Sequence, residues 1–217
     1  MKKLFTITTI AALFCAASAF GVLSWSYGWE DGTGTALGTY GNATVENSTE
    51  QAYEGTHSLK VIEDPIGGTP QIYLWWVTGL NDGDAVVVSM SAYSHTPLGN
   101  KPEARIWAHY TDSITNINDY SGSASGPGTY MGDSGWTSLT NTWIFDSNSG
   151  NNKGLVIEGR IYSDADPGNN VVYFDNAGIT VSNNNAKIYN AAGDSIPEPI
   201  TFGALILGFG ALFLRKK

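Results

Sequence analysis

The sequence has little cysteine and few charged residues. Its 217 residues include a single Cys, and only 14% of them are Asp, Glu, Lys or Arg. One cysteine excludes a small fold held together by internal disulfides. The 20 acidic residues outnumber the 11 basic ones and give a formal net charge of -9. Such a balance disfavours contact with a phosphate backbone, so we predict no nucleic-acid partner.

Long hydrophobic runs are also missing, except at the two ends of the chain. The repeated apolar spans of about 20 residues that a polytopic membrane protein needs do not occur. The N-terminal end has Lys2 and Lys3, then an uncharged and mostly apolar run, then Ala-Ser-Ala at 17–19. This order predicts a secretory signal peptide over residues 1–19 that is removed after Ala19. The single cysteine, Cys15, lies inside it.

The C-terminal end carries a second uncharged run. Pro197, Glu198 and Pro199 precede the uncharged residues 200–214, and three cations at 215–217 follow them. A helix of that length is about 22 Å long, shorter than the roughly 30 Å hydrocarbon core of a bilayer. The terminal cations should remain cytoplasmic, which places residues 20–196 outside the cell.

These three features in this order resemble the PEP-CTERM sorting signal, over residues 197–217. The resemblance implies a hydrophobic helix at 200–214, export, transient anchoring in the inner membrane, and recognition by an exosortase-type processing enzyme. It further implies delivery to the cell surface or the extracellular matrix. The alternative is an ordinary single-span membrane anchor.

The exported part, residues 20–196, has a composition that favours strands. It keeps 6 Lys and Arg against 19 Asp and Glu, a formal charge of -13, and it has no cysteine. Gly, Asn, Ser, Thr and Asp interrupt every segment in which a helical period could build. Nine runs alternate between apolar and polar residues and are separated by turn residues: 22–29, 43–47, 57–63, 71–77, 85–93, 103–110, 136–145, 155–162 and 171–181.

Nine strands without helices predict an all-β fold, an antiparallel jelly-roll β-sandwich over residues 20–182. A long irregular segment covers residues 111–135, and loops of that length are usually functional or mobile. Residues 183–196 have the composition of a polar linker to the sorting signal.

Five motifs follow one another along these strands: Trp-Glu-Asp-Gly at 29–32, Tyr-Glu-Gly-Thr-His-Ser-Leu-Lys-Val at 53–61, Leu-Asn-Asp-Gly-Asp at 80–84, Trp143, and Val-Tyr-Phe-Asp-Asn-Ala at 172–177. Together they resemble the galactose-binding-like β-sandwiches that include many bacterial carbohydrate-binding modules. The resemblance implies a structural calcium ion, held by the side chains of Glu30 and Asp175 and by backbone carbonyls near Gly55 and His57. Calcium takes six to eight oxygen ligands, which suits an acidic domain. The alternative is that Glu30 begins a turn and Asp175 caps a strand end.

Catalytic motifs are scarce. Gly-Asp-Ser-Gly at 132–135 resembles the nucleophile motif of trypsin-like serine proteases, but Trp136 stands where that family has a glycine. None of the three histidines, at 57, 95 and 109, has that family's sequence setting, and no His-Glu-x-x-His pattern is present. Two acids close together, as a glycosidase needs, would arise by chance among 19. We predict no catalytic residues and no enzymatic activity, and we keep a degenerate hydrolase as a third hypothesis.

A candidate binding surface follows from the alternation in two strands. In 103–110, the apolar residues at 104, 106 and 108 share one face, which leaves Arg105, Trp107 and His109 on the other. In 155–162, the side chains of Glu158, Arg160 and Tyr162 face away from the apolar positions in the same way. Segment 85–93 repeats the pattern. If these strands are neighbours in one sheet, their outer faces form one surface.

We predict that this surface binds carbohydrate or exopolysaccharide. Trp107 would stack on a sugar ring, and the groups that hydrogen-bond its hydroxyls would be Arg105, Glu158, Arg160 and Tyr162. The alternative is that Glu158 and Arg160 pair with neighbouring strands and that Trp107 lies under the long loop as a second small core. The protein would then be a structural matrix protein that acts through protein contacts. An open Trp107 favours glycan binding, and a covered one favours the structural role.

Overall fold

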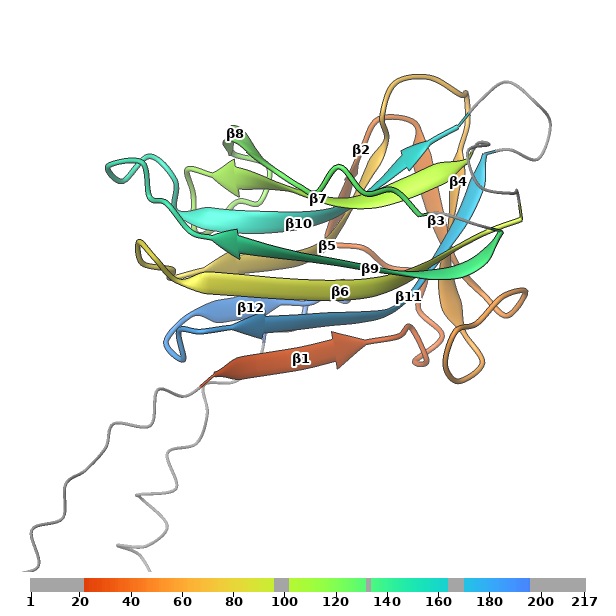
Figure 1. The fold of residues 1–217 in the computed structure, drawn as a ribbon, viewed down its shortest axis with the longest axis horizontal. Helices are drawn as coiled ribbons and strands as arrows, with labels where there is room; N and C mark the ends of the chain where they lie inside the picture. Colours follow the sequence, from red (N-terminus) through yellow and green to blue (C-terminus); the bar gives the residue numbers. More distant parts are fainter. Residues whose placement is uncertain (1–21, 96–101, 132–133, 164–169, 196–217) are drawn as a thin grey trace, which may run out of the picture.

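The computed structural model describes residues 22–95, 102–131, 134–163 and 170–195. The predicted signal peptide at 1–19 and the predicted sorting signal at 197–217 lie outside these residues. The described residues form twelve strands in two six-stranded antiparallel sheets. The sheets stack face to face (Figure 1), so the prediction of an all-β sandwich is confirmed. Within these ranges, no helix is long and apolar enough to cross a membrane.

The first sheet has the strand order β3-β4-β11-β6-β9, with β1 also paired to β11. Its strands are β1 (Leu23–Tyr27), β3 (Ala43–Ser48), β4 (Ser58–Glu63), β6 (Ala85–Ser94), β9 (Gly135–Ile144) and β11 (Val171–Val181). The long strand β11 therefore holds β4 and β1 along one edge and β6 along the other.

The second sheet has the order β12-β5-β10-β7-β8, with β2 also paired to β5. Its strands are β2 (Gly38–Tyr40), β5 (Gln71–Thr78), β7 (Glu103–Thr111), β8 (Tyr120–Ser125), β10 (Gly154–Tyr162) and β12 (Lys187–Tyr189). The central strand β10 pairs with β5 on one side and β7 on the other, so its outer face is the middle of the sheet.

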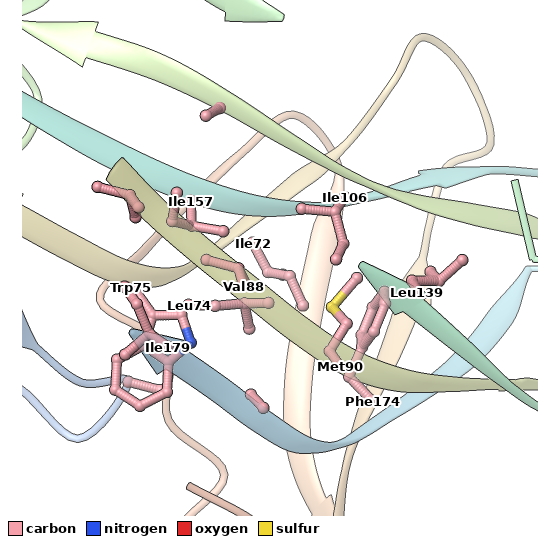
Figure 2. Close-up of a cluster of buried hydrophobic side chains, with 14 of the residues drawn as sticks. Ile72, Leu74, Trp75, Val88, Met90, Ile106, Leu139, Ile157, Phe174 and Ile179 are labelled. Carbon is pink, nitrogen blue, oxygen red and sulfur yellow. The ribbon is translucent and has the colours of Figure 1, made fainter. Parts of the chain in front are cut away.

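The core fills the space between the two sheets. Every second side chain of a strand points inward, and Figure 2 shows Ile106 and Ile157 of the second sheet meeting Val88, Met90 and Phe174 of the first. Gly159 lies on the inner face of β10, where an added Cβ would come within 3.1 Å of side-chain atoms of Ile72 and Phe174. Close packing at this point therefore requires a residue without a side chain.

A β-bulge in β5 changes which side chains reach the outer face of the second sheet. Ile157 pairs with Trp75, whereas the next residue of β10, Glu158, pairs with Tyr73, so Leu74 is an extra residue in β5. Leu74 and Trp75 both belong to the core as a result. Tyr73 and Trp76 instead pack together on the outer face, where they form a small apolar cluster with Val156.

All nine strands predicted from alternation are present, and three further strands are β2, β8 and β12. Strand β8 lies inside the segment expected to be irregular. The structure corrects the predicted linker. Within residues 183–195, Lys187–Tyr189 pair with β5, and Ile188 is completely buried. A strand of three residues is too short to show alternation, and its place is set by a free edge of β5 that the sequence does not reveal.

Replacing Ile188 tests this correction. Ile188→Ala removes a fully buried side chain, so we expect a loss of about 2–5 kcal/mol in the free energy of unfolding, measured by denaturant titration. The matched control, Lys187→Ala, changes an exposed neighbour in the same strand and should stay within about 0.5 kcal/mol of the wild type. Equal stability of the two variants would mean that the segment is a linker after all.

Candidate functional site

The five residues predicted to bind glycan come together on the outer face of the second sheet. Strands β7 and β10 are neighbours, with Arg105 opposite Arg160 and Trp107 opposite Glu158. The strand at 85–94 does not join this face, because β6 belongs to the first sheet. That part of the prediction is wrong: alternation shows which side chains share a face of a strand but not which strands share a sheet.

Two arginines lie against one indole ring on this face. The guanidinium carbon of Arg105 is 4.2 Å from the ring centre of Trp107, and that of Arg160 is 4.6 Å from it. The indole Nε1 also donates a hydrogen bond of 3.1 Å to the hydroxyl of Ser123 on β8. Trp107 is thus half-buried and already stacked, and its contacts hold the two arginines in place.

Arg105 has further aromatic neighbours at the same end of the sheet. Its guanidinium carbon is 4.8 Å from the ring centre of Tyr130 and 5.0 Å from that of Tyr162. The two tyrosine rings meet edge to face, with 5.1 Å between their centres. Three aromatic rings therefore surround one cation, which restricts the side-chain rotamers of Arg105.

A buried carboxylate lies beneath this face. Glu158 is completely buried and accepts a hydrogen bond from Nδ1 of His109, which is only 3% exposed. The other carboxylate oxygen of Glu158 accepts a hydrogen bond from Nε of Arg160 at 2.7 Å. The amide of Gln71, with its nitrogen toward Glu158, donates to both carboxylate oxygens at 3.1 and 3.2 Å and accepts from Nη2 of Arg160 at 3.1 Å. All three neighbours therefore satisfy the hydrogen-bonding capacity of the buried carboxylate, and the guanidinium of Arg160 compensates its charge.

A pocket of about 510 Å³ opens above this network. This volume lies within the range of about 300–1,000 Å³ that is common for ligand sites. Its lining residues come from five strands and one loop: Thr39, Tyr40, Gln71, Tyr73, His109, Asn118, Tyr120 and Arg160. Tyr40 on β2 is 64% exposed and Tyr120 on β8 is 63% exposed. Strands β5, β10 and β7 form the floor of the pocket. Because β2 pairs with β5 and β8 pairs with β7, the two rings stand on opposite sides of this floor. Exposed aromatic walls over a polar floor are typical of a ligand-binding pocket.

The pocket differs from the surface that the sequence predicts. Of the five predicted residues, only Arg160 lines it. Arg105, Trp107 and Tyr162 form the adjacent stack, and Glu158 lies below the floor. Sequence reasoning did not include Tyr40, Gln71 or Tyr73 in the site. Alternation in 71–77 could have placed Gln71 and Tyr73 on one face, whereas nothing in the sequence indicates that Tyr40 approaches them.

The residues predicted to hold calcium also come together. Glu30, Gly55 and Asp175 line a second pocket, of about 410 Å³, in which Glu54 is a further acid. Burial, with a smaller contribution from the charge of Glu30, raises the pKa of Asp175. No Lys or Arg is among the described residues that line this pocket. Two carboxylates and a third nearby acid, with no Lys or Arg among the described lining residues, are a chemically suitable environment for a divalent ion.

Backbone N–H groups hold both carboxylates in this pocket. Glu30 accepts from the backbone of His57 at 2.8 Å, which lowers the pKa of Glu30. Asp175 accepts from the backbone of Tyr53 at 2.7 Å and of Glu54 at 3.1 Å. The hydrogen bonds to Glu30 near His57 are thus made by backbone N–H groups, and the predicted ligation by backbone carbonyls stays a prediction. In the described part of the chain no three His, Cys, Asp or Glu side chains gather as metal ligands, so a cation would need further oxygens.

Comparison with known proteins shows what this fold is similar to. No protein-family model and no curated protein sequence matches the chain. Among solved structures, the CBM22-2 xylan-binding domain from Paenibacillus barcinonensis Xyn10C is similar, with a TM-score of 0.51 and 17% identity over 72% of this chain and 98% of that one. The tandem CBM22-1-CBM22-2 domain from the same protein has a TM-score of 0.52 and 19% identity over 77% of this chain and 47% of that one. The fold is therefore a β-sandwich similar to that of these solved domains.

Removing the buried carboxylate tests its structural role. Glu158→Ala leaves His109, Gln71 and Arg160 without their shared acceptor, so we expect a loss of about 3–5 kcal/mol in the free energy of unfolding. Glu158→Gln keeps an acceptor oxygen and should lose less. Asp112→Ala, at an exposed acid that directly follows β7, is the control and should stay within about 0.5 kcal/mol of the wild type. Thermal or denaturant unfolding measures all three, and a Glu158→Ala variant as stable as the control would contradict this account.

Proposed function

We propose that this protein binds polysaccharide without catalysis, through the pocket between Tyr40 and Tyr120. The observation that carries the proposal is the pair of exposed tyrosine rings above a floor of hydrogen-bonding side chains. A sugar ring has an apolar face of C–H bonds, which packs on aromatic rings, and an edge of hydroxyls. Arg160 and Gln71 on the floor supply donors and an acceptor for such hydroxyls.

The network under the floor supports this assignment. Because Glu158 and Gln71 both contact Arg160, the guanidinium is held in one orientation before a ligand arrives. A group that is already ordered loses less conformational entropy on binding. The solved CBM22-2 domain, which has a similar fold, is described as xylan-binding, and we extend polysaccharide as a ligand class to this pocket.

We further propose that the protein is exported and sorted. Residues 1–19 would act as a signal peptide, and residues 200–214 would hold the chain transiently in the inner membrane. An exosortase-type enzyme would recognise Pro197, Glu198 and Pro199 and pass the protein to the cell surface or extracellular matrix. The sequence of both ends supports this route.

We also propose a structural calcium ion beside Glu30 and Asp175. Gly55 lines the same pocket, and His57 orients Glu30 through its backbone N–H. An ion there would offset the mutual repulsion of the two carboxylates and join the 51–57 loop to the middle of β11. The bound ion would stabilise the fold and would take no part in a reaction.

Retention on immobilised polysaccharide tests the binding pocket. In Tyr40→Ala/Tyr120→Ala both aromatic walls are gone, so we expect retention on the best-bound member of a xylan, cellulose and exopolysaccharide panel to fall at least tenfold. Both side chains are mostly exposed, so the circular dichroism spectrum and the melting temperature should stay close to those of the wild type. Ile144→Ala, at a 60% exposed residue of the first sheet, is the control. Full retention by the double variant would contradict the proposal.

A calcium titration tests the metal proposal. Calcium at about 100 times its Kd would add about 2.7 kcal/mol, or roughly 5–10 °C in Tm. Because the folded state raises the pKa of Asp175, the uncharged carboxyl is favoured at low pH and the calcium effect should shrink as pH falls through that pKa. Asp175→Asn should abolish the effect, whereas Asp112→Asn at a distant exposed acid should retain it. A Tm that changes neither on addition of calcium nor on addition of a chelator at neutral pH would refute the site.

A further inference from the structure

A second group of aromatic and charged side chains lies on the opposite face of the sandwich, on the outer face of the first sheet. Five residues from five neighbouring strands stand in register and form one row across this sheet: Glu46, Lys60, Tyr173, Tyr93 and Trp136. We call them the transverse row. At about 4.8 Å between strands, the row is about 19 Å long. Figure 1 shows the strands that carry it, β3, β4, β11, β6 and β9.

Aromatic rings cover one half of the row. The ring centres of Tyr173 and Tyr93 are 5.9 Å apart, and those of Tyr93 and Trp136 are 5.4 Å apart. Tyr53, which is 48% exposed, meets the ring of Trp136 edge to face with 5.6 Å between centres. Because the backbone of Tyr53 donates to the buried Asp175, the position of this exposed ring is fixed by the pocket next to it.

Hydrogen-bonding groups occupy the other half. Lys60 forms ion pairs with Glu46 at 3.2 Å and with Glu50 at 2.9 Å. The phenol of Tyr173 donates to the second oxygen of Glu50. The bond to Glu50 raises the pKa of Lys60, and burial, followed by the bond to Glu50, raises that of Tyr173. Lys60 and Tyr173 thus keep their protons at neutral pH and donate to the glutamates beside them.

These features decide which kind of partner fits. The charge of -13 on residues 20–196 repels anionic lipids and nucleic acids. Charged side chains are depleted from the core of protein interfaces, whereas Lys60 and Glu46 belong to this row and Glu50 is bonded to Lys60. A hydroxylated polymer suits both halves, since its C–H faces pack on the rings and its hydroxyls both donate and accept.

We propose that the transverse row is a second polysaccharide-binding surface, so that one molecule bridges two polysaccharide chains. The inference rests on the proposed function in its ligand class but uses none of the residues of the Tyr40–Tyr120 pocket. The two surfaces lie on the outer faces of different sheets, with the core between them. One chain of polymer on each face would make the protein a cross-linker of a matrix rather than a simple ligand for it.

The test compares two variants of the full chain in two assays. Tyr53→Ala/Trp136→Ala removes the aromatic ring at one end of the row and the exposed ring that packs on it, and Tyr40→Ala/Tyr120→Ala removes the walls of the pocket. Retention on immobilised xylan, cellulose and alginate reports any binding, and light scattering with soluble xylan, hydroxyethyl cellulose and alginate reports cross-linking. Val87→Ala and Ile144→Ala are controls, because both change exposed apolar residues of the first sheet outside the row.

We expect the wild type to increase the light scattering of at least one polymer, with a maximum at an intermediate protein concentration. Each double variant should lose this increase but keep measurable retention, weakened about 100-fold by the loss of avidity. The two controls should behave as the wild type does. If Trp136→Ala affects folding, Tyr53→Ala alone removes the most exposed ring and should reduce cross-linking by itself.

Other outcomes overturn the proposal. A row variant that matches the wild type in both assays, while the pocket variant loses all retention, rejects the row and leaves the pocket in place. Loss of retention in the row variant alone supports the row and rejects the pocket. Absence of any retention by the wild type rejects both surfaces. Self-association that the row variant abolishes without any change in retention would show that the row contacts a second copy of the chain.

Discussion

The buried carboxylate of Glu158 is the constraint on which the candidate binding face depends. A charged group without solvent is costly unless its oxygens are bonded, and here one histidine, one arginine and one glutamine share that role. Those partners are themselves the floor of the pocket between Tyr40 and Tyr120. The requirement to satisfy one carboxylate therefore fixes the orientation of Arg160 and Gln71, which a ligand would meet. Stability and the preorganisation of the pocket arise from the same bonds.

Two β-bulges adapt a regular sandwich to its surfaces. The extra residue in β5 sends Leu74 and Trp75 into the core and leaves Tyr73 and Trp76 on the outer face. A second register shift lies in β11 between Asp175 and Gly178, where Asn176 has a φ of 47°. Asp175 thereby faces the acidic pocket while Phe174 and Ala177 remain in the core. Bulges of this kind re-aim side chains without changing the order of the strands.

The outer faces of the two sheets have related chemistry. Each carries aromatic rings beside bonded charges: Arg105 and Arg160 against Trp107 on one face, and Lys60 with its glutamates beside Tyr173 on the other. The core separates these faces, so contacts made on one do not compete with contacts made on the other. A domain with this arrangement presents two separate surfaces for contacts.

The sequence by itself determined the fold class, nine of the strands and the faces on which Arg105, Trp107, Glu158 and Arg160 lie, because alternation and turn residues are local signals. It also predicted, from motifs, that Glu30 and Asp175 lie close together. Only the tertiary structure decided that Trp107 is held between arginines, and that Tyr40 and Tyr120 form the open walls. It also decided that residues 187–189 are a strand and not a linker. These features depend on which strands share a sheet and on where bulges shift the register, and both are set by contacts between segments far apart in the chain.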